Sequence, residues 1–235
     1  HLMLKLPYSF ILYVNISILL EIEMNNLKKQ FIEFTLNHEI LRFGSFTLNS
    51  GRESPYFFNT GLCNDGHLLS SLAGFYSESI ITNSLDYDFL FGPAYKGITL
   101  ATSISQTLYT KHNINKPYCH NRKEAKTHGE SGIFVGTKPS GKALIVDDVI
   151  SSGKSISDSI NLLKKNDAQP SSVLVAFDRM EVGNEDRASK ELNDDHSVKV
   201  YSIITLEDII DYIKTDNSLS PHLSEMQKYI SQYKR

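Results

Sequence analysis

From residue 25 to the C-terminus, apolar residues recur with a helical period in some segments and form short continuous runs in others. Leu27, Phe31 and Phe34 lie three or four positions apart, which predicts an amphipathic helix that ends near residue 38. Further helices are predicted over residues 68–83, 97–111, 154–166, 207–214 and 223–233. Short apolar runs predict strands over residues 46–48, 56–59, 88–92, 117–121, 142–146, 173–177 and 198–204.

After the first two short strands, which surround a Ser-Gly-Arg turn, strands alternate with helices. This alternation is typical of βαβ units and predicts an α/β fold with a mainly parallel sheet. Ligands of such sheets bind at the carboxyl ends of the strands. The turn at residues 93–97, Arg122, Asp147 and Arg179 would all lie at that edge.

Composition adds little to this pattern. The 235 residues suffice for one domain with a large core, or for a domain with a small appendage. A hydrophobic content of 40% and a charged content of 22% are ordinary for a globular protein, and a net charge of −3 gives no general reason to expect nucleic acid binding. Cys63 and Cys119 form no CxxC motif, so we expect reduced thiols in a cytoplasmic protein.

The first 23 residues differ from the rest. Residues 6–20 form an apolar run that polar residues interrupt, shorter than the roughly 20 residues of a membrane span. No small-residue cleavage site follows it. Because Met24 directly precedes the first amphipathic helix, we expect the working domain to cover residues 24–235 and residues 1–23 to be a non-native or mis-assigned extension. A genuine N-terminal anchor is the alternative interpretation.

Residues 143–155 are the most informative segment. A buried strand ends in Asp147 and Asp148, whose carboxylates can accept hydrogen bonds from a vicinal diol at the sheet edge. The loop from Ser151 to Ser155 offers backbone N–H groups and hydroxyls at a helix N-terminus, where an anion is favoured. Together they predict a site for a ribose 5-phosphate. The alternative is an ordinary strand with a capped turn, and the spacing of a nucleoside triphosphate P-loop is absent.

Two further segments carry cations. In the Gly-Pro turn at residues 92–97, Lys96 could meet a pyrophosphate, although a plain turn with an exposed lysine would have the same sequence. Residues 121–132 concentrate Arg122, Lys123, Lys126 and His128 between glycines, as a lid over a polyanion requires. A solvated charged loop is the alternative interpretation for that segment.

The remaining candidates would recognise a planar acid. Phe57 and Phe58 follow a turn and could cover a flat heterocycle, or they could pack in the core. Arg179 follows a predicted strand and could bind a carboxylate bidentately, or it could form an ion pair within the protein.

Taken together, these motifs make the chain from Met24 onward resemble the bacterial-type orotate phosphoribosyltransferases. The most specific segments are Ser54-Pro55-Tyr56-Phe57-Phe58-Asn59 and the Arg-Lys-Glu-x-Lys-x-His pattern from Arg122 to His128. Residues 30–34, 50–52, 90–98, 128–130 and 146–150 also match. The resemblance implies a type I phosphoribosyltransferase fold, a five-stranded parallel sheet flanked by helices, with a small hood built from about residues 24–65 and a C-terminal segment.

The resemblance further implies Mg²⁺-dependent transfer of ribose 5-phosphate from phosphoribosyl pyrophosphate (PRPP) to orotate, giving orotidine 5′-monophosphate and pyrophosphate in pyrimidine synthesis. It implies a homodimer in which one subunit offers lid residues to the other subunit's site, and Mg²⁺ held mainly by PRPP rather than by protein ligands. No nucleic acid or membrane partner is expected.

By the same likeness, Lys126, Asp147 and Asp148 are the catalytic residues, and Phe57, Phe58, Ser151 and Arg179 bind orotate. The implied PRPP-binding residues are Tyr95, Lys96, Arg122, Lys123, Lys126, His128, Asp147, Asp148, Val149, Ile150, Ser151, Ser152, Gly153, Lys154 and Ser155. Two positions depart from the family pattern: Asn49 replaces an expected lysine, and Lys154 replaces a small residue, often threonine.

Two other functions remain open at this point. One is a phosphoribosyltransferase for a purine base, which would share the PRPP motifs and differ in the hood. The other is a PRPP-sensing transcription regulator, which would need a DNA-binding module and a basic face, and the sequence displays neither.

Overall fold

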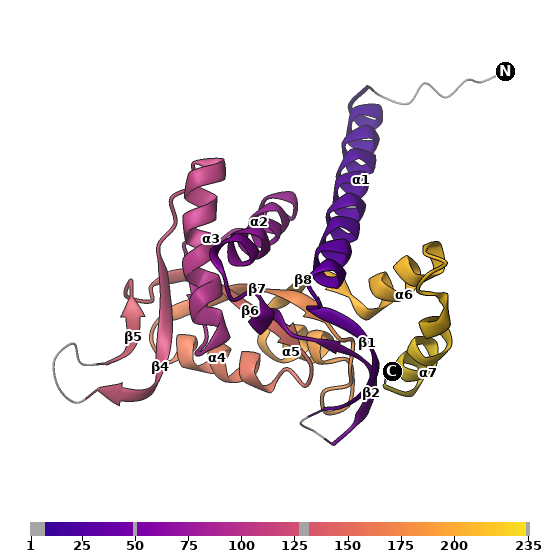
Figure 1. The fold of residues 1–235 in the computed structure, drawn as a ribbon. Coiled ribbons are helices and arrows are strands. Elements are labelled where there is room, and N and C mark those ends of the chain that lie inside the picture. Colours follow the sequence, from indigo (N-terminus) through magenta and orange to yellow (C-terminus); the bar gives the residue numbers. More distant parts are fainter. Residues whose placement is uncertain (1–7, 49–50, 127–131, 234–235) are drawn as a thin grey trace.

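The computed structural model describes residues 8–48, 51–126 and 132–233 (Figure 1). A six-stranded sheet in the order β5-β4-β3-β6-β7-β8 forms the centre of the molecule. Its strands are β3 (Phe89–Gly92), β4 (Tyr118–Lys126), β5 (Gly132–Gly136), β6 (Gly141–Ile150), β7 (Ala168–Asp178) and β8 (Lys199–Thr205). The pairs β4-β3, β3-β6, β6-β7 and β7-β8 are parallel, whereas β5 pairs antiparallel with β4 at the edge.

Helices cover both faces of this sheet, and two hydrophobic cores result. The helices α2 (Gly66–Thr82) and α3 (Lys96–His112) lie on one face, and α4 (Lys154–Lys164) and α5 (Ala188–His196) lie on the other. Alternation along β6 serves both cores, because Leu144 and Val146 face the first and Ile145 faces the second. Both faces are therefore buried, which explains the continuous apolar runs in these strands.

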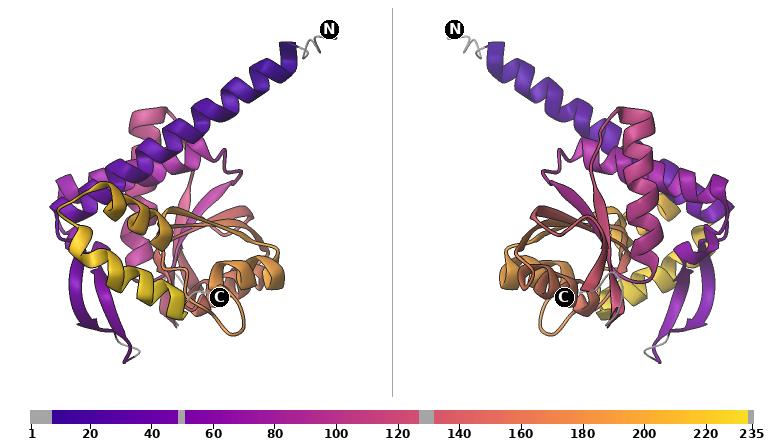
Figure 2. Two further views of the ribbon diagram at one scale, coloured as in Figure 1. Left: turned by 90° about the vertical axis from the view of Figure 1, so that its right-hand side faces the viewer. Right: turned by 90° about the vertical axis from the view of Figure 1, so that its left-hand side faces the viewer.

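A smaller unit packs beside the sheet and joins a hairpin that follows α1 to the last helices of the chain. The hairpin β1 (Leu41–Thr47) and β2 (Glu53–Phe58) is followed by the 3₁₀ turn η1 (Thr60–Leu62). The helices α6 (Leu206–Thr215) and α7 (Leu223–Tyr233), joined by the turn η2 (Ser220–His222), return to this hairpin, and α7 packs against β2. We call this unit the hood, and Figure 2 shows it to one side of the sheet.

The first helix is longer than the sequence pattern predicts. The prediction begins near residue 25, whereas α1 runs from Tyr8 to Asn37, and its N-terminal half projects away from the body in Figures 1 and 2. Its C-terminal half packs through Phe31 and Ile32, which are buried, while Leu19 and Ile22 are exposed. Among the described residues, no helix combines the length and hydrophobicity needed to cross a bilayer.

The five parallel strands that the resemblance implies are present as β4-β3-β6-β7-β8, and the antiparallel edge strand β5 is added to them. Two other predictions need correction. The strand predicted over residues 117–121 is longer, because β4 continues to Lys126: its pairing with β3 ends at His120, and Lys126 pairs with Gly132 of β5. Helix α5 lies in a region without a predicted element, because Ala188 and Leu192 are its only buried residues and give too weak a pattern.

Candidate active site

A cleft of about 640 Å³ opens at the carboxyl ends of β3, β6 and β7, beneath the hairpin β1–β2. Four segments that are distant in sequence line it, namely the hairpin with the adjacent Asn59, the start of α3, the end of β6 with the loop after it, and the residues after β7. The lining residues are Thr47, Leu48, Arg52, Phe57, Phe58, Asn59, Lys96, Asp148, Val149, Ser151, Ser152, Arg179 and Glu181. This is the edge at which parallel sheets bind ligands.

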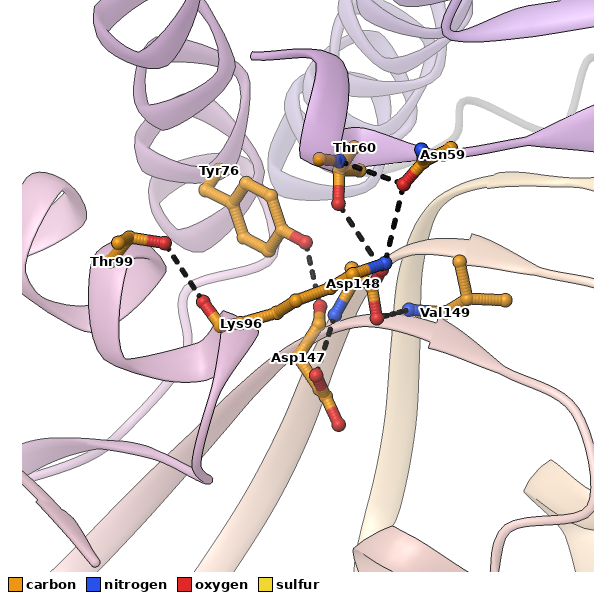
Figure 3. A network of polar contacts seen from close by, with 9 residues as sticks. Asn59, Thr60, Tyr76, Lys96, Thr99, Asp147, Asp148 and Val149 are labelled. Carbon is orange, nitrogen blue, oxygen red and sulfur yellow. Dashed lines mark hydrogen bonds and ion pairs between the residues drawn. The ribbon is translucent and has the colours of Figure 1, made fainter. Parts of the chain in front are cut away.

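The acidic pair Asp147 and Asp148 stands near the end of β6. The backbone N–H of Asp148 donates to Asp147 Oδ1 at 2.9 Å, and that of Val149 donates to Asp148 Oδ1 at 2.9 Å. The Tyr76 hydroxyl donates to the Asp147 carbonyl at 2.6 Å, which ties the strand end to α2 (Figure 3). Burial, together with the neighbouring Asp148 carboxylate, raises the pKa of Asp147.

Lys96 connects the acidic pair to the hood. Its Nζ lies 2.5 Å from Asp148 Oδ2 and 3.5 Å from Asn59 Oδ1, and the Thr60 hydroxyl donates to the same Asp148 oxygen at 3.1 Å (Figure 3). The ammonium group remains half-exposed at the cleft. A cation therefore stands beside the acidic pair, with its ammonium group facing the cleft.

The turn before α3 places Lys96 through a close backbone approach. A Cβ at Gly92 would lie 1.9 Å from the Gly97 carbonyl oxygen, and one at Gly97 would lie 2.6 Å from Pro93 Cδ. Neither position accepts a side chain without displacement of the turn. The two glycines that the sequence motif contains are thus required by packing.

The aromatic pair of β2 divides between the cleft and the core. Phe57 is half-buried at the cleft, with its ring 5.5 Å from that of Phe46 and beneath the Arg42 guanidinium. Phe58 is buried and packs 4.9 Å from the Phe177 ring, so only part of it borders the cleft. Phe57 is the aromatic residue better placed to cover a heterocycle.

Arg179 lies in a buried polar network at the opposite wall. Its Nε donates to Glu181 Oε1 at 2.7 Å, and its Nη2 donates to the Tyr229 hydroxyl at 3.1 Å. Arg52 Nη2 donates to the other oxygen of Glu181 at 2.7 Å. Two guanidinium groups therefore meet at one side of the cleft and share a single carboxylate.

The remaining predicted residues lie around the cleft rather than in its wall. Tyr95 is 67% exposed, and Lys123 Nζ lies 4.4 Å from the centre of its ring. Arg122 Nη1 donates to the Gly132 carbonyl at 3.2 Å and joins the two strands of the lid hairpin. The backbone of Lys126 ends β4. His128 and the departure at Asn49 lie outside the described residues.

The phosphate-loop residues form the connection between β6 and α4. Ile150 ends the strand and is buried, while Ser151 and Ser152 line the cleft. Gly153 has a φ of 75° as the N-cap of α4, which begins with Lys154 followed by Ser155. Lys154 lines a neighbouring hollow of about 270 Å³ between α4 and α5.

Several cleft residues were not among the sequence candidates. Arg52, Asn59 and Glu181 line it, and Thr60 contacts Asp148 from the hood. Arg52 and Asn59 belong to motifs that carry the resemblance, so their segments gave a signal. The sequence contains no such signal for Glu181, because a single acidic residue after a strand is common. Its contact with Arg52 spans 129 positions and cannot be predicted from either segment.

Comparison with known proteins identifies the family to which this chain belongs. A family model described as the phosphoribosyl transferase domain matches residues 65–215, so the chain belongs to the phosphoribosyltransferases. Proteins named orotate phosphoribosyltransferase from Enterobacter sp. (strain 638) and from Haemophilus influenzae are each 46% identical over 211 residues, covering 89% of this chain and 99% of their own length. At that identity and coverage, the chain is a member of the orotate phosphoribosyltransferase family, and it is an enzyme.

Solved structures of that family have the same fold. The orotate phosphoribosyltransferase of Francisella tularensis matches with a TM-score of 0.78 at 40% identity, over 88% of this chain and 100% of that chain. The enzyme from Aeropyrum pernix matches with a TM-score of 0.62 at 26% identity, over 79% and 98%. The predicted type I phosphoribosyltransferase fold is thereby confirmed.

Proposed function

We propose that this enzyme transfers ribose 5-phosphate from PRPP to orotate, releasing pyrophosphate and forming orotidine 5′-monophosphate for pyrimidine synthesis. The observation that carries the proposal is one cleft with two chemically different walls. One wall holds the acidic pair and the Ser151–Ser152 loop, and the other holds Arg179 and Arg52. A sugar phosphate fits the first wall, and a planar acid fits the second.

The first wall explains how the donor would be held. Asp147 and Asp148 accept hydrogen bonds from the ribose hydroxyls, and the loop of residues 151–155 binds the 5-phosphate at the N-terminus of α4. Lys96 stands beside the acidic pair and meets the pyrophosphate. As the bond from C1 to pyrophosphate breaks, negative charge grows on the leaving group, and Lys96 stabilises that charge more strongly than in the ground state.

The second wall would hold the acceptor. Phe57 covers one face of the orotate ring, Phe58 borders it, and Arg179 with Ser151 binds its polar edge. In this placement N1 of orotate attacks C1 from the side opposite to the departing pyrophosphate and inverts that carbon. Positioning supplies much of the acceleration, since the protein forms no covalent bond to the sugar.

Mg²⁺ fits this site as a substrate-bound ion. Among the described residues, no three His, Cys, Asp or Glu side chains come together as a metal-binding group. Mg²⁺ commonly takes one or two carboxylates, substrate phosphates and waters, and the acidic pair meets that need. Bound with PRPP, the ion would neutralise charge on the pyrophosphate. We propose that Asp147 and Asp148 assist in holding it through hydroxyls or water.

The hairpin β4–β5 is the proposed lid. It carries Arg122 and Lys123 at the sheet edge beside the turn of Tyr95, and Lys126 ends its first strand. We propose that the lid of one subunit, with Arg122, Lys126 and His128, closes over the site of its dimer partner. Closure would also exclude water, which otherwise hydrolyses PRPP. The buried free thiols of Cys63 and Cys119 suit the reducing cytoplasm, where we place the enzyme.

The decisive experiment measures pyrophosphate release from PRPP and Mg²⁺ with orotate, uracil, hypoxanthine or adenine as the acceptor. We expect release with orotate alone, and activity only with a purine would instead identify a purine phosphoribosyltransferase. DNA binding without turnover would favour the regulator. In the same assay, Lys126→Ala should lower kcat at least about tenfold, which is roughly 1.4 kcal/mol of barrier. An unchanged single-turnover rate would remove Lys126 from catalysis.

A further inference from the structure

Glu181 lies at the centre of the buried network beside the cleft. Its side chain is 1% exposed, and its two oxygens face different partners. Oε1 accepts hydrogen bonds from Arg179 Nε at 2.7 Å and from the Tyr229 hydroxyl at 2.8 Å, and Oε2 accepts one from Arg52 Nη2 at 2.7 Å. One carboxylate therefore joins three elements: the hairpin β1–β2, the segment after β7 and the C-terminal helix α7.

These contacts fix the orientation of Arg179. Its Nε is held by Glu181, its Nη2 is held by the Tyr229 hydroxyl, and its guanidinium lies 4.8 Å from the centre of the Tyr56 ring. The Arg179 side chain is 9% exposed, so little freedom remains. A charged group held on one edge and one face in this way is preorganised for a ligand, because it loses little entropy when the ligand binds.

The charge of the network is also set by Glu181. Arg179 and Arg52 carry two positive charges, and Glu181 neutralises one of them. Without it, two neighbouring guanidinium groups would repel each other in a largely buried wall, where charge interactions are stronger than in water. With it, these three charged groups together carry one net positive charge, which suits a ligand that brings one carboxylate.

We propose that Glu181 is a positioning residue that sets the recognition of an acidic base. It aligns Arg179 and Arg52 as a paired clamp for the carboxylate of the acceptor, and Tyr229 extends this alignment to α7. The inference rests on the proposed function and adds a residue to it. The rival explanation is that Glu181 only stabilises the fold, in which case both substrates would be affected alike.

The test is Glu181→Gln, which keeps the shape of the side chain but replaces one acceptor oxygen by a donor. One guanidinium then loses its partner, so we expect the KM for orotate to rise by about tenfold or more. We expect the KM for PRPP to stay within about twofold of wild type and kcat within about threefold, because the wall that we propose for PRPP is untouched. The preference for orotate over uracil, which lacks the carboxylate, should fall in parallel. An unchanged KM for orotate, or an equal rise for PRPP, would overturn the proposal.

Tyr229→Phe keeps the proposal testable if the first variant does not fold. This change removes only the hydroxyl between Arg179 and Glu181. We expect the KM for orotate to rise about threefold, at the lower end for one hydrogen bond, because Glu181 still holds Arg179 through its Nε. The matched control is Tyr233→Phe, one turn further along α7, whose hydroxyl accepts from Gln232. Its kinetics should equal those of wild type, and an equal change in both tyrosine variants would overturn the proposal. Wild-type turnover of orotate is measured first: its absence would refute the proposed function itself, and with it this inference.

Discussion

Replacing Lys96 with glutamine tests whether the cation beside the acidic pair stabilises the departing pyrophosphate. The change removes one positive charge and keeps a side chain of similar reach. Asp148 retains its hydrogen bond from the Thr60 hydroxyl and Val149 N–H, so the end of β6 keeps most of its support. The expected loss is therefore catalytic rather than structural.

The magnitude follows from the position of Lys96 Nζ at the cleft. Two unit charges about 4 Å apart interact by about 4 kcal/mol at the effective dielectric of a site near the protein surface. Because the lysine side chain is 51% exposed, solvent screening reduces this value, and about 2 kcal/mol is a reasonable expectation. Applied to charge that develops in the transition state, this corresponds to a decrease of about 30-fold in kcat.

The assay follows the loss of the near-ultraviolet absorbance of orotate at saturating PRPP and Mg²⁺. Lys142→Gln is the matched control, because it removes the same charge at the other end of β6, where Lys142 pairs with Asp86. Single-turnover rates should accompany kcat, since product release could otherwise hide a slower chemical step. A single-turnover rate for Lys96→Gln within about threefold of that of Lys142→Gln would refute the reasoning.

Three further predictions concern the scaffold of the site. Asp147→Asn should raise the thermal midpoint at pH 8 and give no gain near pH 4. The pKa of Asp147 is higher in the folded than in the unfolded protein, so ionisation of this carboxyl destabilises the fold as the pH rises above its pKa in the unfolded chain. An equal gain at both pH values would contradict this. Gly92→Ala should lower kcat by more than about tenfold, because the added Cβ would lie 1.9 Å from the Gly97 carbonyl oxygen. Gly66→Ala is the control, since the space around Gly66 is open, and it should leave kcat unchanged. Tyr76→Phe should lower the free energy of unfolding by about 1 kcal/mol, measured by urea titration, because the 2.6 Å bond to the Asp147 carbonyl is lost, and an unchanged value would show that water replaces it.

The sequence predicts well which segments form the cleft wall around Asp148, because that wall is built from local signals. A continuous apolar run identifies β6 as a buried strand, and the residues that follow it must lie at the carboxyl edge of the sheet. The same logic places Lys96 after β3 and Arg179 after β7. In each case a few adjacent residues determine both the element and the direction in which the chain leaves it.

The hairpin β4–β5, which we propose as the lid, is harder to predict because two determinants conflict. Charged residues from Arg122 to Lys126 favour a solvated loop, whereas the structure continues β4 to Lys126, which pairs with Gly132 of β5. Both are satisfied because this part of β4 extends beyond the pairing with β3, which ends at His120, so Lys123 and Glu124 remain exposed. The residue types in this segment do not show which strand its backbone pairs with. The hairpin can therefore be identified only when the position of β5 is known.

The wall around Arg179 shows why the sequence alone does not identify some cleft residues. Glu181 is a single acidic residue after a strand, and its partner Arg52, although it belongs to a recognised motif, lies 129 positions away. Their burial is tolerable only because they pair, and the pairing exists only once β2, β7 and α7 have packed together. A motif can therefore identify the enzyme family, whereas the contacts that hold Arg179 depend on tertiary packing. Under our proposal for Glu181, substitutions at Glu181 or Tyr229 alter the choice of acceptor and leave the motifs at residues 92–97 and 143–155 unchanged.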